Sequence, residues 1–290
     1  MSELTLIVLA AGVGSRFGGV KQMATVDDTG HTLIDYSIFD ACRAGFGRII
    51  CVVTPQLEPD FHERVGRRIA RHADLVYAHQ TLDALPPGYD VPDGRVKPWG
   101  TAQAVLVAIP QVDGPFATIN ADDFYGQSSY EKMATFLGTT SSDHAMIGYR
   151  LTNTLSPSGT VSRGVCQVGD DGYLVDIHER TALKATEGGA TDADGTFYPA
   201  DTLVSMNFWG FRADAAQAFR DGFPAFLDGA SSATSEYYLP DVARQLIPRV
   251  RVIPTSEAWL GVTYSDDLPA VRQRLAELVE AGVYPPELWP

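Results

Sequence analysis

A short apolar run followed at once by glycines constrains the fold of this chain more than any other feature. Residues Leu4 to Ala11 are almost continuously apolar, and the run stops at Gly12. Such a run is typical of a strand that is buried on both faces of a parallel sheet. In the segment from Gly12 to Gln22, glycines let the backbone approach a phosphate and present several N–H groups to it. The sequence therefore predicts an α/β fold with a phosphate site at the end of its first strand.

Strand-like and helix-like patterns alternate through the first half of the chain, which is the rhythm of βαβ units. After the first strand we expect helix 32–45, strand 48–54, helix 61–72, strand 75–77, helix 101–109 and strand 115–120. From about residue 145 the pattern is less regular, with strands expected near 146–149, 164–168 and 203–208. The stretch 188–195 is predicted to be a flexible loop, and 267–282 an amphipathic closing helix.

Composition limits the class of protein. The 290 residues include 45% hydrophobic ones, enough for one large domain, and the net charge is −14. This charge argues against a general role on nucleic acid or an anionic membrane, since both are bound mainly by Lys and Arg. Three scattered cysteines, no leader-like start and no long apolar span together favour a cytoplasmic protein.

The glycine-rich turn fits neither of two common phosphate motifs. A dinucleotide fingerprint needs Gly where this chain has Phe17, and a Walker turn needs Ser or Thr after its lysine, where Lys21 precedes Gln22. The run from Leu9 to Gln22, Leu-Ala-Ala-Gly-x-Gly-Ser-Arg-Phe-Gly-Gly-x-Lys-Gln, instead resembles the signature of the sugar-phosphate nucleotidyltransferase family. That resemblance implies a Rossmann-like, three-layer α/β/α fold with a mixed, mainly parallel sheet. It also implies that a sugar 1-phosphate is joined to a nucleoside triphosphate, giving an NDP-sugar and pyrophosphate.

The resemblance extends to a set of nucleotide-binding positions. The family carries a base-recognition glutamine at a strand end and a Gly-x-Ala-x-Ala helix start, which match Gln80 and the segment from Gly100 to Ala104. A glutamine amide suits the carbonyl and N3–H of uracil or thymine, so we expect UTP or dTTP. The implied nucleotide-binding residues are Leu9, Ala10, Ala11, Gly12, Gly14, Ser15, Gln22, Gln80, Gly100 and Thr101.

Two adjacent carboxylates, Asp122 and Asp123, follow an apolar strand, where open α/β sheets place ligand groups. Mg²⁺ is a natural partner for such carboxylates. The family holds its metal with an aspartate in this segment, which implies Asp122 first and Asp123 second as metal ligands. One departure stands out, because Gly261 occupies the place where many relatives have a second metal-binding aspartate.

The sugar-phosphate side is implied by shorter matches. Gly164 lies in a turn that resembles the sugar-contacting turn, Glu179 and Arg180 resemble a Glu-Lys segment, and Asn207 ends a strand where relatives often contact sugar.

The acceptor needs no general base, because a sugar 1-phosphate is already largely dianionic near neutral pH. The resemblance then implies that Arg16 stabilises the leaving pyrophosphate, Lys21 orients the acceptor phosphate and Asp122 holds Mg²⁺. These three are the predicted catalytic residues.

We expect a single nucleotidyltransferase domain over residues 1–290. Its nucleotide-binding half spans about 1–145, its sugar-binding half about 146–265, and a C-terminal helix and tail 266–290. The oligomeric state stays open, a homo-oligomer included.

Three other functions remain open. A cytidylyltransferase could couple phosphocholine, with Trp99, Tyr149 and Trp209 caging its ammonium group. A non-catalytic sensor of nucleotide sugars is suggested only by Gly261. A glycosyltransferase would share the sheet and the aspartate pair, but it would not need Arg16 and Lys21 around a triphosphate.

Overall fold

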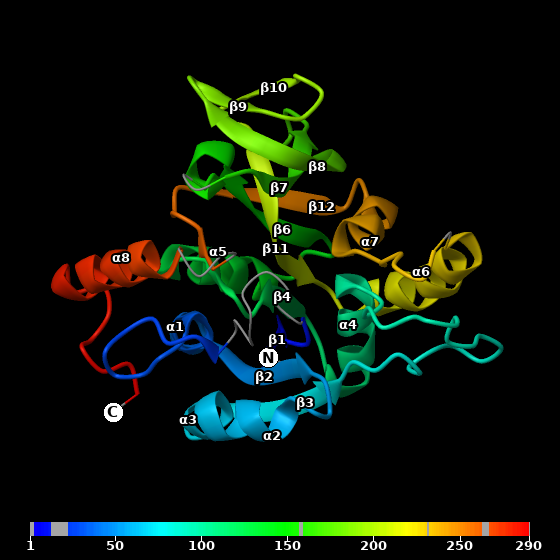
Figure 1. Ribbon diagram of the computed structural model, residues 1–290, viewed down its shortest axis with the longest axis horizontal. Coiled ribbons are helices and arrows are strands. Elements are labelled where there is room, and N and C mark those ends of the chain that lie inside the picture. The colour runs from blue at the N-terminus through cyan, green and yellow to red at the C-terminus, as the bar shows by residue number, and fades with distance from the viewer. Residues whose placement is uncertain (1–2, 13–22, 157–158, 231, 263–266, 290) are drawn as a thin grey trace.

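The computed structural model describes residues 3–12, 23–156, 159–230, 232–262 and 267–289. In this part of the chain a mixed sheet of eleven strands forms the centre, with helices on both of its faces (Figure 1). The predicted mixed α/β fold with parallel central strands is therefore confirmed.

The first half of the chain builds the parallel part of the sheet. Its strands are β1 (Leu4–Leu9), β2 (Phe46–Val53), β3 (Asp74–His79) and β4 (Phe116–Asn120), in the order β3-β2-β1-β4. Both β2 and β4 pair with β1 in parallel, and β2 pairs with β3 in the same way. All four carboxyl ends therefore meet at one edge.

The second half adds mostly antiparallel strands. The strand β11 (Leu203–Phe211) joins the halves, because it pairs antiparallel with β4, β6 and β7. The remaining strands are β6 (His144–Arg150), β7 (Val161–Val168), β8 (Leu174–Thr186), β9 (Gly189–Thr191), β10 (Phe197–Pro199) and β12 (Val250–Thr255). A separate two-stranded sheet pairs β5 (Asp123–Phe124) with β13 (Leu260–Gly261).

The helices form the outer layers. On one face lie α1 (Leu33–Ala44), α5 (Gln127–Leu137) and α8 (Leu268–Glu280), and on the other α4 (Thr101–Ala108), α6 (Ala215–Gly229) and α7 (Leu239–Leu246) (Figure 1). The helices α2 (Glu58–Phe61) and α3 (Arg67–Ile69) run on through a π-helical turn, His62–Gly66. Short 3₁₀ turns follow at Ile109–Gln111 and Leu151–Thr154.

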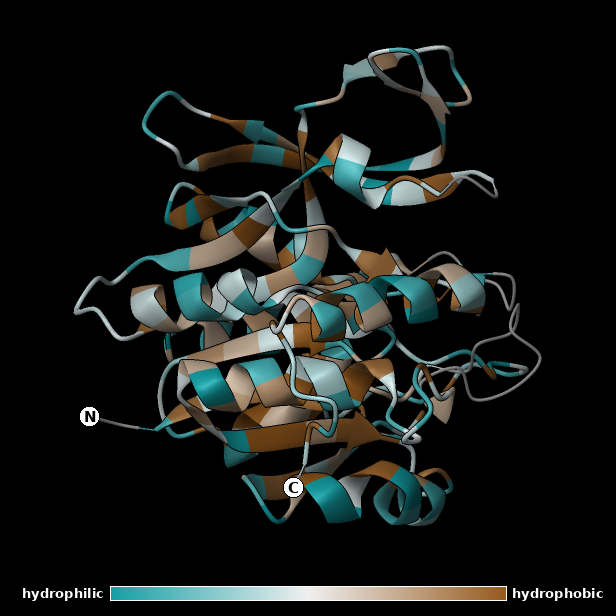
Figure 2. Cartoon of the chain, turned by 90° about the vertical axis from the view of Figure 1, so that its left-hand side faces the viewer, coloured by the Kyte–Doolittle hydropathy of each residue, from teal (hydrophilic) through white to brown (hydrophobic). Residues whose placement is uncertain are grey.

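Alternation along β1 shows how the sheet separates two cores. Leu6 and Val8 belong to the apolar cluster under α1 and α5, whereas Ile7 belongs to the cluster under α4 and α6. Successive side chains of a strand point to opposite faces, so a continuous apolar run fills both cores. Figure 2 shows the consequence, with brown strands between helices that carry teal residues on their outer surfaces.

Two predicted segments of the second half have different outcomes. The closing helix expected at 267–282 is confirmed as α8, in which Val271 and Leu275 are buried. The flexible loop expected at 188–195 is wrong in part, because residues 189–191 form β9 between β8 and β10. This strand was not expected because its residues are small and carry no apolar alternation. Asp192 closes the following turn by accepting hydrogen bonds from the N–H groups of Asp194 and Thr196. No helix in the described ranges is long and apolar enough to cross a membrane.

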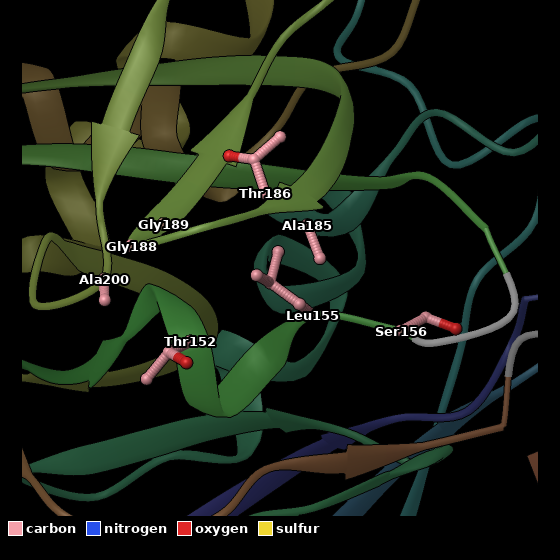
Figure 3. Close-up of a pocket in the computed structure, with 8 residues that line it drawn as sticks. All are labelled: Thr152, Leu155, Ser156, Ala185, Thr186, Gly188, Gly189 and Ala200. Atoms are coloured by element: carbon pink, nitrogen blue, oxygen red, sulfur yellow. The ribbon is translucent and has the colours of Figure 1, made fainter.

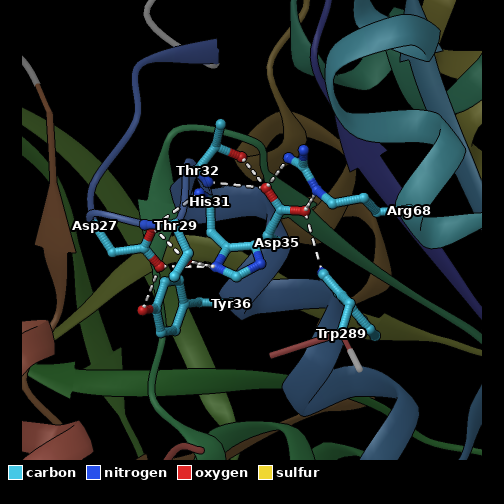
Figure 4. Close-up of polar contacts among 8 residues, drawn as sticks. All are labelled: Asp27, Thr29, His31, Thr32, Asp35, Tyr36, Arg68 and Trp289. Carbon is cyan, nitrogen blue, oxygen red and sulfur yellow. Dashed lines mark hydrogen bonds and ion pairs between the residues drawn. The ribbon is translucent and has the colours of Figure 1, made fainter. Parts of the chain in front are cut away.

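The C-terminal tail is anchored on α1 through buried carboxylates. Asp35 accepts two hydrogen bonds from Arg68, at 2.9 and 2.7 Å, and one from the Trp289 indole at 3.2 Å (Figure 4). In the same view Asp27 accepts bonds from His31 and Tyr36, which secure the segment between the glycine-rich turn and α1.

A second anchor joins the Tyr284 hydroxyl to the buried Asp40 carboxyl, at 2.6 Å. Burial raises the pKa of Asp40 to about 7, although Tyr284 and Arg43 oppose the shift. Because this folded-state pKa lies above that of an unfolded aspartate, the unfolded chain loses the proton first. Stability from the protonated Asp40 is therefore complete below about pH 4 and is lost as pH rises through 7.

We predict that Asp40→Asn removes this loss, since asparagine stays neutral and can still accept the Tyr284 bond. Between pH 5 and pH 8 the variant should gain roughly 2–3 kcal/mol in free energy of unfolding relative to wild type. Urea denaturation of both proteins across that range is the measurement. A difference that does not change with pH would contradict the prediction.

Candidate functional site

The strongest candidate site lies where the parallel strands end. Residues after β1, β3 and β4, together with the start of α4, surround a cavity of about 660 Å³, here called the strand-end cavity. Its volume falls within the range of roughly 300–1,000 Å³ that small-molecule sites occupy. Eight of the predicted residues line it: Leu9, Ala11, Gly12, Gln80, Gly100, Thr101, Asp122 and Asn207.

The remaining predicted nucleotide and catalytic residues are not among those that line the cavity or are not described by the structure. Ala10 is completely buried and does not line the cavity. Gly14, Ser15, Arg16, Lys21 and Gln22 lie outside the described residues, so their roles stay predictions.

Gln80 presents one kind of hydrogen-bonding atom to the strand-end cavity. Its Nε2 donates to the Gly100 carbonyl at 3.0 Å and to Gln103 Oε1 at 2.8 Å. The Gln103 amide is held in turn, because its Nε2 donates to the Ala84 carbonyl at 3.2 Å. Main-chain carbonyls only accept, so neither amide can turn over. Gln80 therefore has only Oε1 left to bind a ligand. Of the two contacts expected with uracil or thymine, Oε1 can accept a bond from the base N3–H but cannot donate one to the base carbonyl.

Gly100 has a packing role in addition to its predicted place in the nucleotide site, which stays a prediction. Its φ is +104°, and a Cβ there would lie 2.4 Å from the Tyr237 carbonyl oxygen. The neighbouring main chains are hydrogen-bonded, from Tyr237 N to Trp99 O at 2.7 Å and from Ala102 N to Tyr237 O at 3.0 Å. The glycine therefore permits close packing of α4 against the segment before α7.

The two adjacent carboxylates face different cavities. Asp122 lines the strand-end cavity, whereas Asp123 lines a neighbouring one of about 190 Å³, here called the polar cavity. Asp123 is 5% exposed, and its Oδ2 accepts bonds from Asn120 Nδ2 at 2.8 Å and the Tyr125 hydroxyl at 3.1 Å. Asp122 is thus the carboxylate placed beside the predicted nucleotide positions.

The structure also explains the glycine at position 261. Gly261 pairs with Asp123 between β13 and β5. A Cβ at this position would lie 2.2 Å from the Trp259 ring and 3.1 Å from Asp123 Oδ1. The indole therefore occupies the space that a side chain at 261 would need, and a carboxylate there would require Trp259 to move.

The polar cavity contains a fixed cation that the residue-by-residue matches missed. Arg163 is 8% exposed, donates to the Ser162 carbonyl at 2.8 Å and to the Thr154 carbonyl, and lies over the Trp259 ring at 4.6 Å. Burial lowers the pKa of Arg163 to about 10, while the charges of Asp123 and Glu179 oppose this shift. It therefore remains a cation at neutral pH.

The predicted sugar-side residues separate in space. Gly164, Glu179 and Asn207 line the polar cavity, together with Ser205 and Trp259. Glu179 is exposed. Its pKa is nevertheless raised, because desolvation by its surroundings outweighs the opposing effect of the Arg163 charge.

Arg180, in contrast, does not line the polar cavity. Its charge acts on Asp192 and Tyr198 near the β9–β10 turn. Its predicted contact with the sugar phosphate stays untested, and Arg163 is the cation that the fold places at the cavity. Position in the Ser-Arg-Gly turn was the only sequence signal for it.

The aromatic cage proposed for a choline group is wrong. Trp99, Tyr149 and Trp209 are at most 1% exposed and line neither cavity. Trp259 does face the polar cavity, but the Arg163 guanidinium lies over its ring. A quaternary ammonium group would meet a cation there rather than an open aromatic face.

Asn207 and Asn120 line both cavities and mark their junction. Asn207 has a φ of +62°, and the pairing of β11 with β6 breaks between Ser205 and Trp209. This bulge is held by a hydrogen bond from Thr118 Oγ1 to the Asn207 carbonyl at 3.3 Å and by the Tyr125 hydroxyl, whose one hydrogen is shared between the Met206 carbonyl at 2.9 Å and Asp123 Oδ2. Bulges of this kind re-aim a side chain, here toward the junction.

A further hollow near β9 offers little chemistry. It has a volume of about 390 Å³, and Figure 3 shows a lining of small residues in which Thr152, Ser156 and Thr186 carry the only polar side chains. It carries no ionisable side chain among its lining residues, so the two joined cavities remain the candidate site.

Comparison with known families agrees with this geometry. Residues 6–119 match the family model described as the MobA-like NTP transferase domain. Over these residues the chain is similar to that domain. The matched segment runs from β1 to β4 and includes most residues that line the strand-end cavity, whereas Arg163, Glu179 and Asn207 lie beyond the match. A sequence comparison with curated proteins gave no match.

Solved structures similar to this chain extend over almost its whole length. A candidate glucose-1-phosphate thymidylyltransferase from Bacillus anthracis has a TM-score of 0.63 and 12% identity, covering 93% of this chain and 94% of its own. An inositol-1-phosphate CTP transferase from T. maritima has 0.64 and 16%, covering 95% and 96%. HddC from Yersinia pseudotuberculosis has 0.59 and 13%, covering 93% and 99%. At these identities the likeness shows the fold, which is that of nucleotidyltransferases.

The positive φ of Asn207 leads to a prediction about stability. Alanine is strained at positive φ and glycine is not, so Asn207→Ala should unfold at roughly 1 kcal/mol lower free energy than Asn207→Gly. Both variants lose the amide, and urea denaturation of the pair therefore isolates the backbone effect. Equal stability of the two variants would show that the bulge relaxes without cost.

Proposed function

We propose that this protein joins a sugar 1-phosphate to a nucleoside triphosphate, with UTP or dTTP favoured, and releases pyrophosphate. The observation that carries the proposal is a pair of adjacent cavities whose linings share Asn120 and Asn207. The transferase match accounts for the strand-end cavity, and the adjoining polar cavity can take a second substrate. One reaction would then unite ligands from both sides of the junction.

The chemistry needs position and charge rather than a base. An oxygen of the acceptor phosphate attacks the α-phosphorus, a new P–O bond forms, and the bond to the β-phosphate oxygen breaks as pyrophosphate leaves. The acceptor phosphate is already largely dianionic at neutral pH, so no proton has to be removed. Catalysis then depends on aligning the phosphates and neutralising their charge, the parts predicted for Lys21 and Arg16.

Asp122 would hold Mg²⁺ together with the nucleotide phosphates. Mg²⁺ is commonly bound by one or two carboxylates plus substrate phosphates, which fits a single aspartate at the wall of the strand-end cavity. Groups of three or more metal-ligating side chains are absent from the described part of the chain. The ion would supply charge neutralisation at the phosphates, and Asp123 would serve instead to hold Asn120.

The polar cavity supports a polyhydroxylated acceptor over phosphocholine. Glu179, Ser205 and Asn207 offer hydrogen-bonding groups to hydroxyls, and the Arg163 cation opposes a quaternary ammonium group. The similar structure from T. maritima acts, by its name, on inositol 1-phosphate, and inositol is also a polyol. Free thiols at Cys42, Cys51 and Cys166 agree with the cytoplasmic location proposed for this reaction.

The deciding experiment measures pyrophosphate release with Mg²⁺, each nucleoside triphosphate, and a panel of sugar 1-phosphates, inositol 1-phosphate and phosphocholine. Release that needs both a nucleotide and a sugar 1-phosphate, and that falls in Arg16→Ala, is the expected result. Tight nucleotide binding without release for any pair would favour a sensor of nucleotide sugars instead.

The carboxylate assignment makes a separate prediction. Asp122→Asn should lower kcat by about a hundredfold or more, because charge stabilisation at the phosphates is lost. The matched control is Asp113→Asn, since the Asp113 side chain is 93% exposed and lies outside both cavities. A kcat for Asp122→Asn within twofold of wild type would exclude Asp122 as the principal ligand.

The orientation of Gln80 predicts how the base is read. If the base N3–H donates to Gln80 Oε1, N3-methyl-UTP should bind at least about tenfold more weakly than UTP. Isothermal titration with the two nucleotides gives the ratio. Equal affinity for both would show that Gln80 does not accept a bond from N3 of the base.

A further inference from the structure

The two cavities meet at a pair of asparagine amides whose orientation is fixed from one side. Asp123 Oδ2 accepts a bond from Asn120 Nδ2 at 2.8 Å. An ionised carboxylate only accepts, so the nitrogen of Asn120 must face Asp123 and its oxygen must face away. Asn120 Oδ1 then accepts from Asn207 Nδ2 at 3.5 Å. Asp123 therefore sets the direction of the Asn120 amide, and the Asn207 nitrogen lies toward Asn120 Oδ1.

Within the described residues, the two asparagine side chains have N–H groups at the junction that no acceptor uses. Each carboxamide nitrogen carries two N–H groups, and each of these two spends one on its neighbour. The 3.5 Å separation between the asparagines is long for a hydrogen bond, so the amides satisfy each other poorly. A ligand oxygen with several lone pairs would be a better partner for both.

The backbone supports the same conclusion. Asn207 reaches the junction only because β11 bulges and residue 207 adopts a φ of +62°. Main-chain strain of this kind persists where surrounding structure enforces it, and it concentrates at functional sites. Here Ser205 Oγ accepts a hydrogen bond from the Asn207 main-chain N–H at 3.3 Å, and Thr118 Oγ1 donates one to the Asn207 carbonyl.

We infer that Asn120 and Asn207 bind the α-phosphate of the nucleotidyl group, which exchanges pyrophosphate for the acceptor phosphate, and that Asp123 is the positioning residue for this pair. The inference rests on the proposed function, because the new P–O bond must form where the two cavities share residues. Among the lining residues of both cavities, Asn120 and Asn207 are the shared ones. Neutral amide donors suit this place. They can bind the same phosphate oxygen in the substrate and in the product, and their own charge does not change during the reaction.

The test compares Asn120→Ala, Asn207→Gly and Asp123→Asn with wild type. Glycine removes the Asn207 amide while tolerating its backbone, and asparagine at 123 lets the Asn120 amide turn over. Gln217→Ala is the control, because Gln217 bonds to Asp221 on the exposed side of α6.

In steady-state pyrophosphate release, kcat/KM for the sugar 1-phosphate should fall about tenfold to a hundredfold in Asn120→Ala and Asn207→Gly. In Asp123→Asn the same kcat/KM should also fall, but by a smaller factor. Affinity for the free nucleoside should change less than about twofold in all three, because the base and ribose do not reach the junction. Unchanged kcat/KM in folded variants would overturn the inference.

Isothermal titration with UDP-glucose gives a readout that needs no turnover. Weaker binding of UDP-glucose by both asparagine variants, with uridine binding retained, supports the inference. Equal UDP-glucose affinity in wild type and variants overturns it while leaving the proposed function standing. Wild-type protein that binds neither nucleotides nor nucleotide sugars overturns the proposed function, and the inference with it.

Discussion

The hydroxyl of Tyr125 joins the two parts of the fold at the site. It accepts the main-chain N–H of Asn120 at 3.0 Å and lies 2.9 Å from the Met206 carbonyl and 3.1 Å from Asp123 Oδ2. The end of β4 and the bulge of β11 are thereby held against each other in a completely buried environment. Since β4 belongs to the parallel half and β11 to the antiparallel half, this hydroxyl, together with the pairing of the two strands, fixes the relative position of the two cavities.

The sequence predicted the fold where pattern and burial coincide. The residues of β1 fill cores on both faces of the sheet, so the strand is a continuous apolar run. Such a run can be identified in the sequence without tertiary information. The strand-end cavity could be predicted for a related reason, because parallel strands deliver the residues that follow them to a common edge. Gln80 and Asp122 meet there although 42 positions separate their numbers in the chain.

Orientation and bulges could not be predicted in the same way. Nothing in the sequence shows that Gln80 spends its amide hydrogens on Gly100 and Gln103, since those bonds depend on how the loop folds back. The positive φ of Asn207 follows from a break in pairing between β11 and β6. The role of Arg163 could not be predicted for a further reason. It is buried against Trp259, which lies nearly a hundred residues further along the chain.

The central claim is that one substrate occupies each cavity and that their phosphates meet between Asn120 and Asn207. A crystal structure with bound UDP-glucose and Mg²⁺ tests this most directly. The account predicts uracil beside Gln80 in the strand-end cavity, glucose beside Glu179 and Arg163 in the polar cavity, and the diphosphate within hydrogen-bond distance of both asparagines. A nucleotide sugar lying wholly in one cavity, or with its diphosphate away from the two amides, would contradict the account.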